Sequence, residues 1–165
     1  MSPYRAPAWL PGGHLQTLYA ALLVPRARVD FIRERWDTPD GDFIDLDWTD
    51  NSGAATTPLV VLFHGLEGGS RSSYATALMA ATRARGWRGV VVHFRGCGGE
   101  LNRLPRAYHS GDSREIDWIL RRLQFAHPAR RLCAAGVSLG GNALLKWLGE
   151  QGAAAISVIS AAAAV

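Results

Sequence analysis

The sequence predicts one α/β domain with a mainly parallel sheet, because short apolar segments alternate with longer segments of helical periodicity. The apolar segments at 58–63, 89–94 and 131–136 have the length of strands and the composition of strands that are covered on both faces. Each is followed by a glycine-containing loop and then by a segment in which apolar residues recur at helical spacing. This alternation is typical of parallel strands joined by right-handed crossover helices.

An antiparallel hairpin is expected before the parallel part, at one edge of the sheet. The segments 30–36 and 42–48 read DFIRERW and DFIDLDW, and both are short and rich in residues that favour strands. The residues between them include PDG at 39–41, which is the chemistry of a tight turn.

Residues 1–28 are expected to form an extension that packs on or near the core. Its apolar run from Leu18 to Val24 predicts a short core-packing helix ended by Pro25; a position against a membrane or over a pocket is the alternative. The run is too short to span a bilayer, and prolines interrupt the apolar centre that a secretory signal would need. We therefore expect a cytoplasmic location, with peripheral membrane contact left open.

About four strands and three crossover helices are expected after the hairpin. Segment 58–63 is predicted to be a central strand, and the helices are predicted over 73–86, 112–127 and 139–152. The last segment, AAISVIS at 154–160, is rich in β-branched residues and is expected to form another strand. With no neighbour on its outer side, this strand would be an exposed apolar edge that is prone to aggregation.

Composition excludes several classes of function. The formal charge of +4 comes almost wholly from arginines scattered along the chain, with no recognition motif, so we expect no nucleic-acid partner. Cys97 and Cys133 form no C-x-x-C pair and have no histidines at ligand spacing, so we expect free thiols and no metal. The glycine-rich loops lack the lysine of a Walker loop and the third glycine of a dinucleotide fingerprint, so no cofactor is expected.

A candidate nucleophile lies in the turn after the third apolar segment. Gly136-Val137-Ser138-Leu139-Gly140 follows a predicted strand and begins a predicted helix. In that context the serine occupies a strained turn with its hydroxyl exposed above the sheet, and the flanking glycines let strand and helix pass closely. The alternative is a glycine-serine helix cap with no chemistry.

A serine that attacks a carbonyl also needs N–H donors for the oxygen that becomes negative. The backbone N–H of Leu139 is expected to be one donor, since it lies at the positive end of a helix. The second is expected from the loop HGLEGG, as the N–H of Leu66 or, alternatively, of Glu67. His64, directly after the strand, is expected to brace this loop by hydrogen bonding rather than to act as a base.

Five blocks of the sequence together resemble the YheT-like branch of the α/β-hydrolase superfamily. These blocks are PAWLPGGHLQTLY, HGLEGG, HFRGCGG, YHSGD and GVSLGGN, in this order. The resemblance implies the amino-terminal half of an α/β-hydrolase fold and an activity on fatty acyl esters. It also implies that Ser138 is the nucleophile, that Leu66 and Leu139 supply the oxyanion hole, and that 95–99 and 108–112 shape the mouth of the pocket.

The acid and histidine that such hydrolases place after the serine are not found in this sequence. Residues 139–165 contain no histidine and no aspartate, and Glu150, the sole acid, would lie about 18 Å along the helix from Ser138. Upstream, His93 ends a predicted strand and His109 lies in the YHSGD loop, both near the same edge, so a rearranged triad is an alternative. We expect a chain that stops about half way through the fold and lacks the triad's aspartate and histidine.

Two functions from different classes follow. The first is a serine hydrolase of the carboxylesterase or lipase type, which cleaves a small-molecule acyl ester through an acyl-enzyme on Ser138. Its activity would require the full-length form. The second is a non-catalytic fragment or interaction module.

Overall fold

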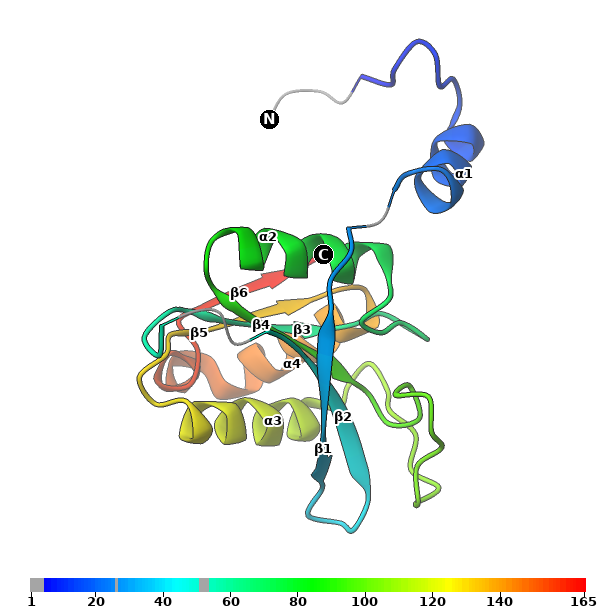
Figure 1. The fold of residues 1–165 in the computed structure, drawn as a ribbon. Helices are drawn as coiled ribbons and strands as arrows, with labels where there is room; N and C mark the ends of the chain where they lie inside the picture. Colours follow the sequence, from blue (N-terminus) through cyan, green and yellow to red (C-terminus); the bar gives the residue numbers. More distant parts are fainter. Residues whose placement is uncertain (1–4, 26, 51–53) are drawn as a thin grey trace.

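The computed structural model describes residues 5–25, 27–50 and 54–165. The strands are β1 (Phe31–Asp37), β2 (Phe43–Thr49), β3 (Leu59–Phe63), β4 (Arg88–His93), β5 (Leu132–Gly136) and β6 (Ala161–Ala164). The helices are α1 (Gly13–Leu22), α2 (Ser73–Ala84), α3 (Ser113–Ala126) and α4 (Leu139–Gln151), and a 3₁₀ helix spans Gly152–Ser157. The strands form one mixed sheet in the order β1-β2-β4-β3-β5-β6, with α2 on one face and α3 and α4 on the other (Figure 1).

The predicted hairpin at the edge of the sheet is confirmed. β1 pairs with β2 in antiparallel register from Phe31 opposite Thr49 to Asp37 opposite Phe43. β2 then pairs antiparallel with β4, so the hairpin is an antiparallel addition to the parallel part of the sheet. β2 is buried along its whole length, whereas most residues of β1 are exposed, as expected for an edge strand.

The predicted central strand is also confirmed, since β3 lies between β4 and β5 and pairs in parallel with both. All five of its residues are buried. Val61 and Phe63 belong to the core cluster that includes α3 and α4, whereas Val60 and Leu62 pack with α2 on the opposite face. A continuous apolar run is therefore required, because both faces of this strand are covered.

The connections leave the sheet on opposite faces at the pair β3 and β5. The connection after β3 runs through α2, and the connection after β5 runs through α4 on the other face (Figure 1). In open α/β sheets, the crevice beyond the carboxyl ends of two such strands is where ligands bind. The loops that begin at His64 and Val137 therefore meet at the position where this fold places a site.

The end of the chain differs from the prediction. Residues 152–157 form a 3₁₀ helix instead of a strand, and the last strand, β6, is built from alanines 161–164. Val158 and Ile159 are buried beside the core, so their β-branched side chains contribute to packing rather than to the sheet. β6 pairs in parallel with β5, from Ala161 opposite Cys133 to Ala164 opposite Gly136, and it is exposed. The expected exposed edge exists, but it is shorter and lies further along the chain.

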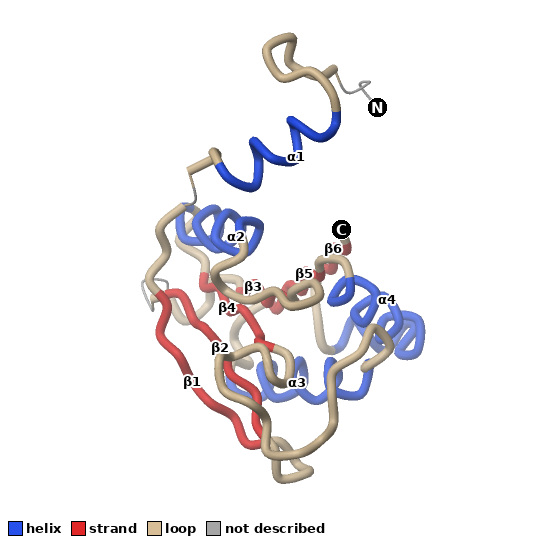
Figure 2. Tube along the Cα trace, turned by 90° about the vertical axis from the view of Figure 1, so that its right-hand side faces the viewer, coloured by secondary structure: helices blue, strands red, loops and turns tan. Residues whose placement is uncertain are grey.

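α1 stands clear of the layers that pack around the sheet, beyond α2 (Figures 1 and 2). The helix ends at Leu22, before Pro25. Leu18 and Leu22 are 53% and 74% exposed, so their side chains are open to solvent instead of packed on the core as expected. No helix within the described part of the chain is long and apolar enough to cross a membrane.

Candidate active site

Ser138 adopts a backbone conformation that is rare for a residue with a side chain. Its φ is 52° and its ψ is −114°, and it immediately precedes the first residue of α4. Its backbone is fixed on both sides, since its N–H donates to the carbonyl of Val165 at 2.7 Å and its carbonyl accepts from Asn142 at 2.9 Å. The residue is exposed. A strained, exposed serine between a strand and a helix is the arrangement of a nucleophile elbow.

Glycines on both sides of Ser138 allow the sharp turn. A Cβ on Gly136 would lie 2.6 Å from the carbonyl oxygen of Gly140. A Cβ on Gly140 would lie 2.5 Å from the carbonyl oxygen of His64, and it would also clash with that of Phe63. The end of β5, the start of α4 and the end of β3 therefore approach so closely that side chains at 136 and 140 are excluded.

The loop after β3 lies directly beside Ser138. A Cβ on Gly65 would lie 3.3 Å from the Cβ of Ser138, and the N–H of Val137 donates to the carbonyl of Phe63 at 3.0 Å. The N–H of Gly65 donates to the hydroxyl oxygen of Tyr74 at 3.0 Å. These contacts hold the first turn of this loop against the turn that carries the serine.

Two backbone N–H groups near Ser138 remain without partners. Among the described residues, neither Leu66 nor Leu139 donates a backbone hydrogen bond. Leu139 is the first residue of α4, where N–H groups have no intrahelical acceptor and the helix dipole favours negative charge. The N–H of Glu67 instead donates to the hydroxyl oxygen of Tyr108 at 3.0 Å. Of the two donors considered in the loop after β3, Leu66 therefore has the free N–H.

His64 is buried and both of its ring nitrogens have hydrogen-bond partners. The backbone N–H of Phe94 donates to Nε2 at 3.1 Å, so Nε2 carries no proton, and Nδ1 donates to the carbonyl of Gly65 at 2.7 Å. Burial lowers the pKa of His64 to about 4, an effect that nearby His93 increases. His64 joins the loops after β3 and β4 as a neutral imidazole and has no nitrogen left for Ser138.

Tyr108 connects the long loop after β4 to the loop beside Ser138. Its ring stacks on Phe94 with centroids 5.3 Å apart, and its hydroxyl also donates to a carboxylate oxygen of Glu67 at 3.1 Å. The same loop contacts the first turn of α4, where the side chain of Asn142 donates to the carbonyl of Ser110 at 2.9 Å. Residues 108–110 therefore lie around the turn of the candidate nucleophile.

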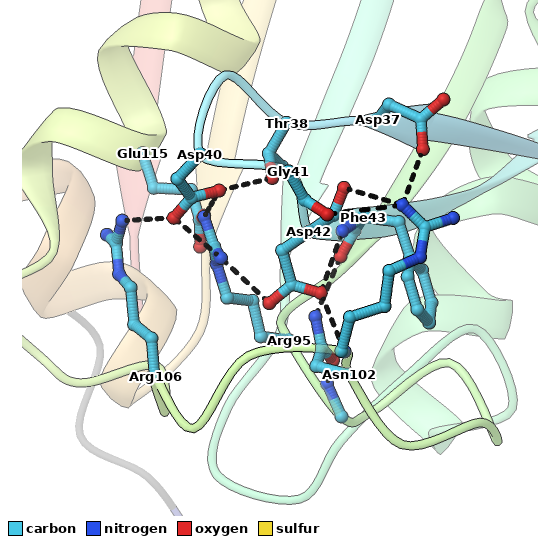
Figure 3. A network of polar contacts seen from close by, with 12 residues as sticks. Asp37, Thr38, Asp40, Gly41, Asp42, Phe43, Arg95, Asn102, Arg106 and Glu115 are labelled. Atoms are coloured by element: carbon cyan, nitrogen blue, oxygen red, sulfur yellow. Dashed lines mark hydrogen bonds and ion pairs between the residues drawn. The ribbon is translucent and has the colours of Figure 1, made fainter.

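Arg95 anchors the beginning of that long loop in a buried network (Figure 3). Its guanidinium donates to Glu115 at 2.7 Å and to Asp42 at 2.9 Å, and it also forms an ion pair with Asp40 at 3.0 Å. The hydroxyl of Thr38 and the guanidinium of Arg95 lower the pKa of Asp40 to about 2. The network joins the hairpin turn, the loop after β4 and the start of α3, and it thereby fixes where the long loop begins.

A second polar cluster, which the sequence analysis did not predict, lies on the α2 face of the sheet. Asp47 accepts hydrogen bonds from Arg33 at 2.7 Å, from Nε2 of His93 at 2.8 Å and from the hydroxyl of Ser70. Burial would raise the pKa of Asp47, but these hydrogen bonds outweigh it and lower the pKa. The sequence signal for this cluster was the alternation of apolar and acidic residues in β2. Because β2 is buried along its whole length, its aspartates require polar partners.

Three members of this cluster, Arg33, Ser70 and His93, line a cavity of about 480 Å³ together with Glu67 and residues 97–99. The cavity reaches the loop after β3, but Ser138 is not among its lining residues. His93, the upstream histidine considered as a base, is turned toward Asp47 and the carbonyl of Cys97, and this accounts for both of its nitrogens.

Among the described residues, neither of the remaining candidates, His109 and Glu150, forms a hydrogen bond with Ser138. Nδ1 of His109 accepts from the N–H of Gly111 at 3.1 Å, and Glu150 is bound by Lys146 on the same helix. Cys97 and Cys133 are free thiols. Within the described ranges, no three histidine, cysteine or acidic side chains are grouped so that they could hold a metal ion.

Comparison with known proteins places this geometry in context. The family model described as the alpha/beta hydrolase fold matches residues 58–163. YheT of Escherichia coli, which is named as an esterase of unproven activity, is 46% identical over 140 residues, covering 84% of this chain and 41% of YheT. The human phospholipase ABHD3 is 33% identical over 155 residues, covering 90% of this chain and 38% of that protein. The chain therefore spans about two fifths of the length of these relatives.

Solved structures show the same fold. The esterase Pf2001 of Pyrococcus furiosus matches with a TM-score of 0.63 at 17% identity, covering 81% of this chain and 50% of that one. A serine hydrolase without a lid from Xanthomonas campestris matches with a TM-score of 0.60 at 19% identity, covering 77% and 59% of the two chains. At these identities, the likeness concerns the arrangement of strands and helices.

Proposed function

Because this chain belongs to the alpha/beta hydrolase fold family, we propose that it carries the nucleophile and the oxyanion hole of a serine esterase. Ser138 is the proposed nucleophile, and the N–H groups of Leu66 and Leu139 are the proposed oxyanion donors. The substrate is a small-molecule carboxylic ester with an apolar acyl chain. The names of relatives such as the human phospholipase ABHD3 support an activity on acyl esters.

The proposed reaction follows from where the serine and the two N–H groups lie. The oxygen of Ser138 attacks the ester carbonyl as a base removes its proton, and the carbonyl oxygen becomes negative between Leu66 and Leu139. Collapse of this intermediate breaks the bond to the alcohol, which leaves with the proton from the base. Water then hydrolyses the acyl-enzyme, and it returns Ser138 with its proton; an alcohol in place of water would give acyl transfer.

The observation that carries the proposal is the combination of strain and free donors around one residue. Ser138 is exposed at a φ of 52°, and the two N–H groups that flank its turn have no partners among the described residues. Strained backbone of this kind persists only where surrounding contacts enforce it, and it concentrates at functional sites. A helix cap without chemistry would not require this conformation, and Ser138 makes no capping hydrogen bond through its side chain.

The base and the acid of the proposed mechanism are assigned to residues outside this sequence. His64 and His93 have partners on both ring nitrogens, and His127 packs against Trp48 with ring centroids 5.6 Å apart. His109 lies in the loop that contacts the first turn of α4, and among the described residues it has a partner on Nδ1 and none on Nε2, so it is the candidate to test within this sequence. His109→Ala tests it: an unchanged rate supports a base that comes from elsewhere.

Ester hydrolysis by the natural polypeptide that contains this chain tests the proposal. With p-nitrophenyl butyrate as substrate, Ser138→Ala is expected to lower kcat by roughly 10⁴-fold or more. Ser160→Ala is the matched control, because that serine is exposed and lies outside the loops around Ser138. A Ser138→Ala protein that retains the activity of the wild type would overturn the assignment.

A non-catalytic interaction module is the second candidate, and the exposed edge of β6 favours it. The four alanines of β6 pair with β5 on one side only, and all four are exposed. Such an edge can accept a further strand from another polypeptide. Absence of activity in every natural form of the protein, together with stable association through this edge, would favour this candidate over the esterase.

A further inference from the structure

Three leucines of α1 form an exposed apolar stripe along one face of the helix. Leu15, Leu18 and Leu22, called here the α1 stripe, are 51%, 53% and 74% exposed. Their spacing of three and four residues places them on the same face of a helix. Figures 1 and 2 both show that α1 stands away from the packed layers of the domain. The stripe therefore has no covering from the folded core.

The opposite side of α1 carries polar side chains that bond to the backbone of their own segment. The hydroxyl of Thr17 donates to the carbonyl of Gly13 at 2.9 Å, and the amide of Gln16 donates to the carbonyl of Leu10 at 3.2 Å. At helical spacing, these two side chains point away from the α1 stripe. The helix is therefore amphipathic, and its apolar face is exposed in the part of the chain that the structure describes.

Two aromatic residues extend the apolar face. Trp9 is 65% exposed and packs edge-on against Tyr19 with ring centroids 5.0 Å apart. Rings of this kind, apolar in body with one polar atom, are enriched where protein meets the boundary between lipid and water. Leu23 and Val24, directly after the helix, are also exposed.

The charges around the stripe decide between the possible occupants. Residues 1–29 contain Arg5, Arg26 and Arg28 and no acidic residue, and Arg5 and Arg28 are exposed. A second copy of α1 docked on the stripe would bring these like charges together. A surface of anionic lipid would instead attract them, because each arginine near such a surface gains favourable electrostatic energy.

We propose that α1 is a membrane-surface helix that docks on anionic lipid through Trp9 and the α1 stripe. Its ten residues extend about 15 Å, half the thickness of a bilayer core, so the helix lies in the interface and does not cross it. The leucines and Trp9 enter the boundary between headgroups and acyl chains, while Gln16 and Thr17 face the water. This contact would bring the Ser138 domain to a surface where apolar esters collect.

Binding to vesicles tests the proposal with the chain as it is. The wild type is expected to sediment with phosphatidylcholine vesicles that contain phosphatidylserine, and to bind vesicles of phosphatidylcholine alone much more weakly. Leu18→Glu combined with Leu22→Glu is expected to lower the partition onto the anionic vesicles at least ~10-fold, since two leucines that would enter the lipid are replaced by negative charges that the anionic surface repels. Rising salt should weaken wild-type binding, because it screens the attraction of the arginines.

Phe125→Glu is the matched control, because Phe125 is 89% exposed and lies at the far end of α3. It should bind the anionic vesicles as the wild type does. Equal binding by the α1 double variant, or no binding by the wild type, would overturn the proposal. A wild type that is dimeric in light scattering and becomes monomeric in the α1 variant would assign the stripe to a second copy instead, and would also overturn it.

Discussion

The hydroxyl oxygen of Tyr108 accepts the backbone N–H of Glu67 at 3.0 Å, and this contact leaves the neighbouring N–H of Leu66 as the free donor beside Ser138. A residue in the long loop after β4 thereby decides which amide of the loop after β3 can face a developing negative charge. The stacking of Tyr108 on Phe94 fixes the ring that makes this contact. The geometry of the candidate site therefore depends on a loop that is distant from Ser138 in sequence.

Tyr108→Phe removes this contact while it keeps the ring. The variant leaves the Glu67 N–H without its partner, and we expect the free energy of unfolding to fall by about 1 kcal/mol, as for a typical lost hydrogen bond. Urea titration measures the change. Tyr19→Phe is the control, because the hydroxyl of Tyr19 bonds to none of the residues that the structure describes, and it should leave the stability unchanged. Equal effects of the two variants would contradict the role given to Tyr108.

Gly140→Ala tests the close approach behind the serine turn. The new Cβ would meet the carbonyl oxygen of His64 at 2.5 Å, which is backbone and cannot move aside without displacing β3. We expect a loss of about 3 kcal/mol or more in the free energy of unfolding.

Gly149→Ala lies in the same helix and provides the matched control. A Cβ at this position has nothing within 4 Å, and the helix should gain roughly 0.5–1 kcal/mol from the lower flexibility of the unfolded chain. Thermal denaturation of the two variants should therefore shift in opposite directions. A Gly140→Ala protein as stable as the wild type would show that strand and helix do not pass as closely as described.

His64 should make stability depend on pH in a defined range. Burial lowers its folded pKa to about 4, below the ordinary value of 6.5. As the pH falls, the unfolded chain therefore binds a proton before the folded protein does. The contribution of the neutral His64 to the free energy of unfolding is complete above pH 6.5 and is lost as the pH falls toward 4. At about 1.4 kcal/mol per pH unit, the total is roughly 3 kcal/mol.

The variant His64→Gln isolates this contribution, since glutamine can replace the hydrogen bonds but does not titrate. Urea denaturation between pH 7.5 and 4.5 should show a smaller loss of stability in this variant than in the wild type. His109→Gln should keep the wild-type dependence, because His109 is exposed. A parallel pH dependence of wild type and His64→Gln would mean that His64 is not held neutral.

Arg95→Met should be far more damaging than loss of a surface ion pair. The change leaves Asp42 and Glu115 buried without their cation, and breaking such a network costs roughly 3–5 kcal/mol. Arg121→Met removes an exposed pair with Asp117 on α3 and should cost less than about 1 kcal/mol. The ratio of the two losses in urea titration is the measurement, and similar losses would contradict a buried role for Arg95.

Local patterns in the sequence were sufficient to predict most of the fold. The turn at 39–41 fixed the hairpin, and the apolar run of β3 required cover on both faces. The serine turn was predicted because its glycines report a close approach that side chains would prevent. The bracing role of His64 followed from its place directly after a strand, and both of its nitrogens are bonded.

Features that depend on tertiary context were not predictable from the sequence. Ile156 and Val158 favour a strand locally, yet residues 152–157 form a 3₁₀ helix. The strand beside β5 is formed by alanines 161–164 instead, because backbone pairing needs no particular side chain. The exposed setting of α1 has no local signal, since the same apolar run suits a core helix. The clusters around Asp47 and Arg95 join segments far apart in the chain, so a local pattern can mark an aspartate that needs partners but cannot show which residues those partners are.

Labelling with a fluorophosphonate probe tests the central claim most directly, because the probe reacts with an activated serine that lies beside an oxyanion hole. In the natural polypeptide that contains this chain, mass spectrometry should find one adduct, on Ser138. The adduct should disappear in Ser138→Ala and persist in Ser160→Ala. Labelling that survives Ser138→Ala, or an adduct on a different residue, would contradict the account.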